Sequence, residues 1–241
     1  MSRGLGDVYK RQAADFTFFI VGNFDENQIR QYVKQYIASL PANKNFEKAV
    51  NDGREIVAGN VRKQFVNNNE GKLAMLAMVW NMDMPLTMKN KLIVSITGQL
   101  MSNELLNSVR EDEGAAYSPY SVGYIDRTYK DNATIQTSFG LNPDKYKTSE
   151  TATINCLEKL SKDIPVAELK KMQEYMLKSY DENIVENGYW LGVLESYVVD
   201  GEDMYTGYKK AVEELTVGDI ENFVDKLIKS ENRFEILMLP E

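Results

Sequence analysis

The sequence predicts an α+β fold with a mainly antiparallel sheet that helices cover on one face. Pairs of strand-like segments are separated by helical patterns, a block of helices follows, and one more strand-like segment ends the chain. With 241 residues, the chain is long enough to bury a sizeable core, and its 43% hydrophobic and 27% charged residues are ordinary for a folded soluble protein. Its single cysteine excludes an internal disulfide, so packing must hold the fold together.

The first expected elements are a short buried strand and a helix. Residues 16–21 (FTFFIV) form a continuous apolar run that ends at a Gly-Asn turn. Asp25, with Gln28 three residues later, resembles a capping box, and the apolar stripe that follows ends before Pro41. A lone strand and helix cannot bury both apolar faces, so we interpret residues 13–40 as the tail of a preceding α/β subdomain.

Two polar stretches flank this unit. Residues 1–12 (MSRGLGDVYKRQ) contain basic residues without an apolar segment behind them, so they are not a secretory signal peptide. We interpret them as a non-native leader that is foreign to the fold, and a native disordered leader is the alternative. Residues 41–54 have the polar, Pro- and Gly-containing composition of a linker. The main subdomain is therefore expected over residues 55–241.

The main subdomain is expected to open with two strands and a long helix. Apolar runs predict strands at 56–66 and 73–80, and a periodic stripe predicts a helix from Thr87 to about Glu111. Gly98 is the weak point of this helix, because glycine disfavours a helix interior. The stripe should pack against the sheet that contains residues 73–80. It includes Leu92, Ile96, Leu100 and Val109.

Two more strands and the helical block follow. Residues 117–125 and 133–139 should form a half-exposed antiparallel pair, because the second segment alternates apolar and polar residues. Asn142 suits the cap of a helix that runs through Leu160. The remaining expectations are helices at 166–182, 188–199 and 205–214, a helix opened by a capping box at Thr216 and Asp219, and a strand at 234–239.

Composition excludes several classes of function. With 28 basic and 36 acidic residues, the net charge of −8 opposes binding to a phosphate backbone, so nucleic acid is not an expected partner. The longest apolar run, residues 73–80, is far shorter than the roughly 18 residues of a membrane span. The chain contains no histidine, which removes the usual zinc ligand, the usual general base and every Ser-His or Cys-His nucleophile.

The most specific stretch is residues 108–124 (SVREDEGAAYSPYSVGY). Arg110 lies near the end of the expected long helix, and Tyr117 lies at the start of the next strand. A guanidinium and a phenol in these places can point into the same space and donate hydrogen bonds to one peptide carbonyl or oxyanion. The structural alternative is that Arg110 pairs with Glu111 or Glu113 and that Tyr117 is a half-buried strand residue.

Several segments carry a family resemblance. LIVSITGQLMSNELLNSVREDEGAAYSPYS (92–121) resembles the signature of the C-terminal, non-catalytic half of the insulinase-like (pitrilysin, M16) zinc metallopeptidases. FTFFIVGNFDENQIRQYVKQYIASLP (16–41) resembles the strand and helix that close one subdomain there. ENGYWLGVLESYVVDGED (186–203) and NRFEILMLPE (232–241) resemble parts of the last subdomain. The likeness covers nearly the whole chain and is nearest to the bacterial zinc-protease branch.

The resemblance implies a fold, a partner and a role for two residues. The fold is the LuxS-like metallohydrolase α/β fold of the M16 family, whose two halves enclose a chamber that admits unfolded peptide. Zinc, bound by HxxEH and a distal Glu, belongs to the other half, and a chain without histidine cannot carry it. In active members, the residues that match Arg110 and Tyr117 hydrogen-bond the bound peptide near the scissile bond.

The first hypothesis is the C-terminal portion of a zinc-dependent M16-type endopeptidase. The chain would supply chamber wall and transition-state hydrogen bonds, and zinc and the general base would come from a histidine-bearing half on the same chain or on a partner subunit. This chain alone would be inactive. The resemblance implies a bacterial parent of a branch that is often exported. The alternatives are a non-enzymatic M16-like structural or peptide-binding assembly subunit, and an unrelated α+β binding module.

Three other groups are interpreted as structural. The acidic segment 200–203 lacks the spaced ligands of a calcium loop and is expected to form a solvated turn. The aromatic residues of the helix at 188–199, which include Trp190 and Tyr197, are expected in the core. The methionines between residues 75 and 84 are interpreted as core or chamber-wall filler.

Overall fold

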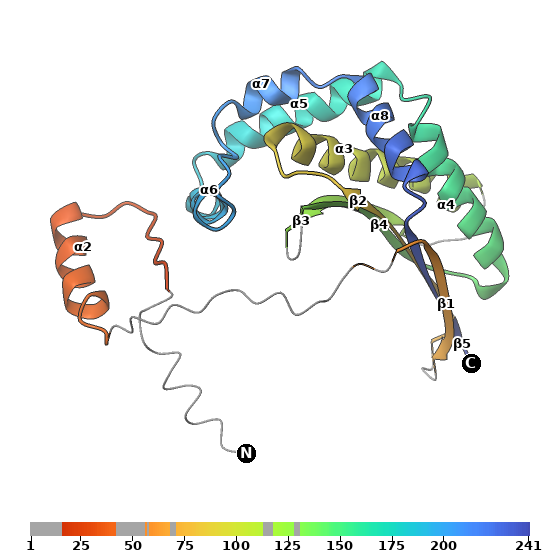
Figure 1. Cartoon of the computed structure of the whole chain (residues 1–241), viewed down its shortest axis with the longest axis horizontal. Helices are drawn as coiled ribbons and strands as arrows, with labels where there is room; N and C mark the ends of the chain where they lie inside the picture. Colours follow the sequence, from red (N-terminus) through yellow and green to blue (C-terminus); the bar gives the residue numbers. More distant parts are fainter. Residues whose placement is uncertain (1–15, 42–55, 57, 68–70, 113–117, 128–130) are drawn as a thin grey trace, which may run out of the picture. The chain divides into compact units, whose positions relative to one another are not determined.

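The computed structural model describes residues 16–41, 56, 58–67, 71–112, 118–127 and 131–241. Contacts divide the chain into two compact units, and we describe each by itself (Figure 1). The smaller unit is Met1–Gly53 with Glu182–Gly201, and the larger is Arg54–Asp181 with Glu202–Glu241. The expected leader, 1–12, and all but the first residue of the expected linker, 41–54, lie outside the described residues.

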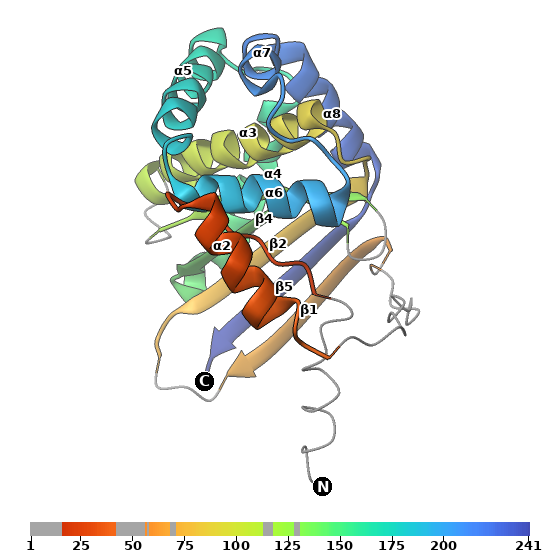
Figure 2. The ribbon, with the colours of Figure 1, turned by 90° about the vertical axis from the view of Figure 1, so that its left-hand side faces the viewer.

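A five-stranded sheet of order β1-β5-β2-β4-β3 forms the base of the larger unit. In the described sheet, β1 and β5 pair in parallel at one edge (Figure 2), and the other neighbouring strands pair antiparallel. This confirms the mainly antiparallel sheet. The strands are β1 Asn60–Asn67, β2 Ala74–Asp83, β3 Tyr120–Asp126, β4 Asn132–Leu141 and β5 Arg233–Pro240.

Helices of the larger unit cover one face of this sheet (Figure 1). Alternate residues of β2, such as Leu76 and Met78, are buried between sheet and helices, as the period of a strand requires. Burial of each such side chain stabilises the fold by about 1.5–3 kcal/mol. None of the described helices is both long and apolar enough to cross a membrane. The helices of this unit are α3 Met88–Leu105, α4 Tyr146–Leu160, α5 Val166–Asn183, α7 Tyr208–Glu213 and α8 Val217–Lys229.

The helix starts follow the capping residues of the sequence. Thr87 caps α3 by accepting a hydrogen bond from the Asn90 N–H at 3.2 Å. Thr216 and Asp219 form the expected capping box of α8. Asn142 caps a 3-10 turn, Pro143–Lys145, that leads directly into α4. Each cap satisfies backbone donors that a helix start would otherwise leave without partners.

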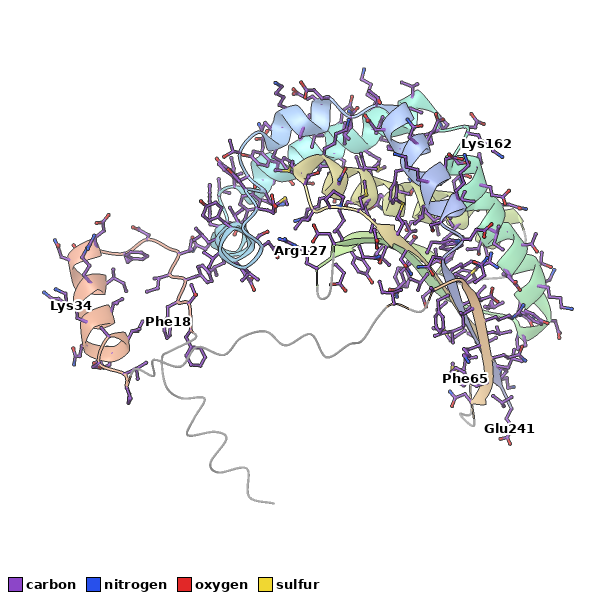
Figure 3. All side chains as sticks on the ribbon, viewed as in Figure 1. Phe18, Lys34, Phe65, Arg127, Lys162 and Glu241 are labelled. Atoms are coloured by element: carbon purple, nitrogen blue, oxygen red, sulfur yellow. The ribbon has the colours of Figure 1, made fainter. Side chains whose placement is uncertain are left out.

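Residues on the other face of the sheet are only partly buried. Met75 on β2 is 40% exposed, and Phe65 on β1, labelled in Figure 3, is 50% exposed. On β3, Tyr120, Val122 and Tyr124 are 42–50% exposed. Of the methionines predicted as core or chamber-wall filler, Met78 faces the helices and is fully buried in the core, whereas Met75 lies on the other face of the sheet.

The smaller unit contains α2 Glu26–Tyr32, a π-helical turn Val33–Ile37 and α6 Asn187–Asp200. Asp25 caps α2 as expected, because its carboxylate accepts a hydrogen bond from the Gln28 N–H at 2.8 Å. The predicted strand at 16–21 is wrong. A strand needs a neighbour for its ladder of hydrogen bonds, and no described strand pairs with this segment.

The prediction that the aromatic residues of α6 lie in a core is also wrong. No residue of α6 is buried, and Tyr197 is 59% exposed. Trp190 is half-buried, and its indole N–H donates to the carbonyl of Ile184 at 2.8 Å. An apolar helix becomes core only where a second layer covers it, and the described residues of this unit do not form such a layer.

Candidate functional site

The two residues predicted to contact substrate follow the long helix α3. Arg110 lies in a π-helical turn, Leu106–Asp112, that continues α3. Its backbone is described but its side chain is not, and Tyr117 lies outside the described residues. The convergence of the guanidinium and the phenol therefore stays a prediction. The structure does describe what holds both ends of the segment that carries them, which is α3 on one side and β3 on the other.

Two glycines bring α3 and β3 into close contact. A Cβ atom at Gly98 would collide with the backbone nitrogen of Gly123, and one at Gly123 would collide with the carbonyl oxygen of Val94. Both obstacles are backbone atoms, which cannot move aside as a flexible side chain can. Gly98, the weak point of the predicted helix, therefore has a packing function that its local sequence does not reveal.

A serine on the next turn of α3 binds the backbone of β3. The Ser102 hydroxyl donates to the carbonyl of Ser121 at 2.9 Å and accepts from the Ser121 N–H at 2.7 Å. We call this pair of hydrogen bonds the Ser102–Ser121 bridge. Both serines are buried. Since β3 is an edge strand of the described sheet, the bridge supplies partners that a neighbouring strand would otherwise supply.

Helix α4 holds the other side of the π-helical turn. Lys159 on α4 contacts both carboxylate oxygens of Glu104 at 2.8 and 3.0 Å, and this hydrogen bond raises the pKa of Lys159. Val109, next to Arg110, is fully buried. Burial raises the pKa of the Cys156 thiol on α4 to about 11, although a hydrogen bond with Ser108 acts in the opposite direction. Contacts with β3 and α4 thus fix the backbone that leads to Arg110.

Hydrogen bonds between Ser102 and Ser121 hold together the two ends of the segment that contains Arg110 and Tyr117. The Ser102–Ser121 bridge joins two residues 19 positions apart. Arg110 lies eight residues after Ser102, and Tyr117 lies four residues before Ser121. Both predicted donors therefore belong to one segment whose ends are held to each other. A guanidinium and a phenol presented together could donate to one carbonyl oxygen.

The residues of this chain do not fit a zinc site. The sequence contains no histidine, and its one cysteine is buried. Among the described residues, no three His, Cys, Asp or Glu side chains gather closely enough to hold a metal ion. The zinc that the resemblance implies has no ligand set on this chain, so we derive no metal-dependent step from it.

A buried carboxyl group lies on β5, beside the edge strand β1 of the described sheet, and was missed in the sequence. Glu235 on β5 is 2% exposed, and its Oε1 lies 3.2 Å from Nε of Arg62 on β1. Arg62 also contacts Glu150 on α4 at 3.2 Å. Burial and the charge of Glu150 raise the pKa of Glu235, and Arg62 opposes them in part. The available signal was a single acid inside the apolar run at 234–239.

The acidic segment predicted as a turn at 200–203 begins with the last residue of α6, and residues 201–203 connect that helix to the turn before α7. Asp203 accepts hydrogen bonds from the N–H groups of Tyr205 and Thr206 at 3.0 and 2.8 Å. A hydrogen bond from the Thr206 side chain, followed by these two backbone bonds, lowers the pKa of Asp203. Its carboxylate therefore stabilises a turn before α7.

Comparisons with known proteins agree on one family and one fold. The model of the family described as peptidase M16 inactive domain matches residues 8–176. No curated protein matches the chain in sequence. A protease from Helicobacter pylori is similar in structure, with 18% identity, a TM-score of 0.75, and coverage of 91% of this chain and 54% of that chain.

Two further solved structures are similar. The periplasmic protease PqqL from Escherichia coli has 18% identity and a TM-score of 0.74, with coverage of 91% of this chain and 25% of that chain. A peptidase M16 inactive domain from Pseudomonas fluorescens has 15% identity and a TM-score of 0.66, with coverage of 91% and 52%. The chain thus spans about a quarter to about half of the length of these structures. Identities this low support a shared fold.

Proposed function

This chain belongs to the peptidase M16 inactive-domain family, and on that premise we propose that it is the C-terminal, non-catalytic portion of a zinc-dependent M16-type endopeptidase. The partner is a histidine-bearing catalytic half, on the same polypeptide or on a separate subunit. Zinc belongs to that half, because this chain has no histidine to bind it. The substrate is unfolded peptide, which the two halves enclose.

The proposed contribution of this chain is a pair of hydrogen-bond donors. Arg110 offers a planar guanidinium that remains charged at any physiological pH, and Tyr117 offers a phenolic O–H. A peptide carbonyl oxygen gains negative charge as its carbon is attacked, so donors aimed at it bind the transition state more tightly than the bound peptide. Such donors accelerate the reaction without carrying out any chemistry themselves.

One observation carries this proposal beyond family membership. The Ser102–Ser121 bridge and the contact between Gly98 and Gly123 hold both ends of the segment that contains Arg110 and Tyr117. Donors that are in place before the peptide binds lose less entropy in the transition state than flexible donors do. What favours the enzyme over a non-enzymatic assembly subunit is the presence of both donors at this spacing in the sequence, because a purely structural half has no need of them.

Reconstitution tests the proposal. The isolated chain should retain no stoichiometric zinc after dialysis and should cleave no peptide. Addition or fusion of the histidine-bearing half should produce peptide hydrolysis above that of the catalytic half alone. Retention of one zinc per isolated chain, or equal hydrolysis by the catalytic half with and without this chain, would contradict the proposed function.

A further inference from the structure

We propose that Arg62, Glu150 and Glu235 form a pH-sensitive latch, which holds the edge strand β1 to helix α4 and loosens when Glu235 loses a proton. The three side chains come from β1, α4 and β5, which lie far apart in the sequence. In the parallel pairing of β1 with β5, Arg62 lies directly beside Glu235. Because β1 is an edge strand of the described sheet, β5 is its single neighbour there.

One guanidinium group lies between two carboxyl groups in this cluster. Nη1 of Arg62 lies 3.2 and 3.4 Å from the two carboxylate oxygens of Glu150. Nε of Arg62 lies 3.2 Å from Oε1 of Glu235. This buried oxygen has no hydrogen-bond partner among the described residues, so the contact with Arg62 is ionic alone. An ionised Glu235 would therefore be a buried charge that is only partly compensated, which is costly.

Helix α4 also holds Arg62 through an aromatic ring. The guanidinium lies over the ring of Tyr146, 5.7 Å from its centre, and the ammonium group of Lys147 lies 5.9 Å from the centre of the same ring. Attraction between a cation and a ring does not require a proton on Glu235. The contact with Tyr146 thus persists in both protonation states of Glu235, and the pH-dependent part of the latch comes from the two carboxyl groups.

A proton on Glu235 allows one guanidinium to compensate both carboxyl groups. Protonated Glu235 can share a hydrogen bond with the Glu150 carboxylate, whose charge Arg62 then neutralises. Burial, and next the charge of Glu150, raise the pKa of Glu235. Arg62 and Arg233 oppose them in part. When Glu235 releases its proton to water, two carboxylates face Arg62 and repel each other, which weakens the contact between β1 and α4.

The loosening should be local to β1. In an opened edge, Glu235 would be exposed to water and would have an ordinary pKa, so the closed edge binds its proton more tightly. Linkage then requires the closed edge to be most stable at low pH and to lose stability as pH rises through the raised pKa. Strand β3, at the other edge of the described sheet, carries none of the three latch residues and provides an internal control.

Hydrogen exchange of the full chain between pH 4 and 8 tests the latch, with rates corrected for the intrinsic effect of pH. The protection of β1 amides should fall with rising pH by at least about threefold more than that of β3 amides. In the same range, a carbon NMR titration should place the midpoint of the Glu235 carboxyl above the ordinary value for glutamate. Equal falls in β1 and β3, or a Glu235 midpoint at or below the ordinary value, would overturn the proposal.

Three variants distinguish the latch from a general effect of charge. Glu235→Gln should abolish the extra fall in β1 protection, because glutamine cannot ionise. Glu150→Gln should reduce it, because Arg62 can then compensate Glu235 alone. Glu158→Gln, at an exposed position of α4, removes the same charge outside the cluster and should leave the fall unchanged. The latch is ruled out if Glu235→Gln keeps the wild-type fall, or if Glu158→Gln reduces it as much as Glu150→Gln does.

Discussion

Glu235 is a carboxyl group inside an otherwise apolar strand, and its surroundings favour the protonated acid. It is 2% exposed, and the charge of Glu150 lies close to it. Arg62 and Arg233 provide partial compensation. Because burial and Glu150 outweigh the two arginines, the pKa of Glu235 lies above its ordinary value. The protonated form contributes its full stability at low pH and loses it as pH rises through the raised pKa.

Replacement of Glu235 by Gln should therefore reduce the loss of stability at neutral pH. Glutamine has nearly the same shape and carries no charge to desolvate, whereas wild-type Glu235 must ionise as pH rises. The free energy of unfolding, measured with urea between pH 4 and 8, should fall less with rising pH in Glu235→Gln than in the wild type. Glu231→Gln, in the turn before β5, is the control for a change of net charge. Parallel pH profiles for wild type and Glu235→Gln would show that Glu235 is ionised throughout.

Single residues also show which parts of the candidate site the sequence could reveal. Arg110 and Tyr117 were found because their residue types and spacing match a family signature. Ser102 was not, because a serine within a helix pattern gives no sign of a partner 19 positions away. Gly98 was interpreted as a local weakness of the helix. The need for a glycine at this position is explained by its close contact with the backbone of Gly123, which only the structure shows. Local patterns do not encode such pairings across elements.

Helix α3 is the element on which the account depends. Leu92, Ile96, Leu100 and Val109 are each at most 3% exposed, which confirms the predicted buried face. The helix packs on the sheet as expected, and its close contacts are with the edge strand β3. The apolar period of the sequence identified the buried face of α3. The strand that α3 contacts most closely is determined by Gly98 with Gly123 and by the Ser102–Ser121 bridge.

Ile96→Asp should destabilise the larger unit strongly. Ile96 is 2% exposed, so the substitution would place a charge without a partner in the core, at a cost of several kcal/mol. Gln99→Asp is the matched control, because Gln99 lies on the exposed side of the same helix. Urea denaturation should show a large loss for Ile96→Asp and a change within about 0.5 kcal/mol for Gln99→Asp. Equal stabilities would mean that the buried face is wrong.

Gly98→Ala separates helix propensity from packing. Propensity alone predicts a gain of about 1 kcal/mol, because alanine favours a helix interior. The structure predicts a loss of about 1–3 kcal/mol, because the new Cβ would collide with the backbone of β3. Gly192→Ala in α6 is the control, since no neighbouring atom lies within 4 Å of its Cβ position. A higher melting temperature for Gly98→Ala would contradict the close approach of α3 and β3.

Helices with strong local signals were predicted well, whereas the strand at 16–21, which would need a partner strand, was not. The helix predicted from Thr87 begins at Met88, and the helix predicted from the capping box at Thr216 begins at Val217. The run at 16–21 has the composition of a buried strand but has no strand pairing in the described structure. A helix satisfies its own backbone hydrogen bonds, whereas a strand requires another strand.

At the scale of the whole molecule, the chain is one part of a larger assembly in our proposal. It spans about a quarter to about half of the length of the similar solved structures. Phe16 and Phe18 are 54% and 49% exposed although they belong to a strongly apolar run, and Phe18 is labelled in Figure 3. We propose that residues 13–40 complete a preceding α/β subdomain, in which a sheet would cover these side chains.

The most direct measurement of the central claim is the turnover of the complete enzyme with Tyr117→Phe, which removes one hydroxyl and keeps the ring. The account predicts a loss of about 10²-fold in kcat, equivalent to about 3 kcal/mol, with a smaller change in peptide affinity and an unchanged melting temperature. Arg110→Lys should also stay below wild-type turnover, because an ammonium group lacks the planar fork of arginine. Tyr120→Phe, on β3, should have no effect. Unchanged turnover with a lower melting temperature for Tyr117→Phe would mean that the pair is structural.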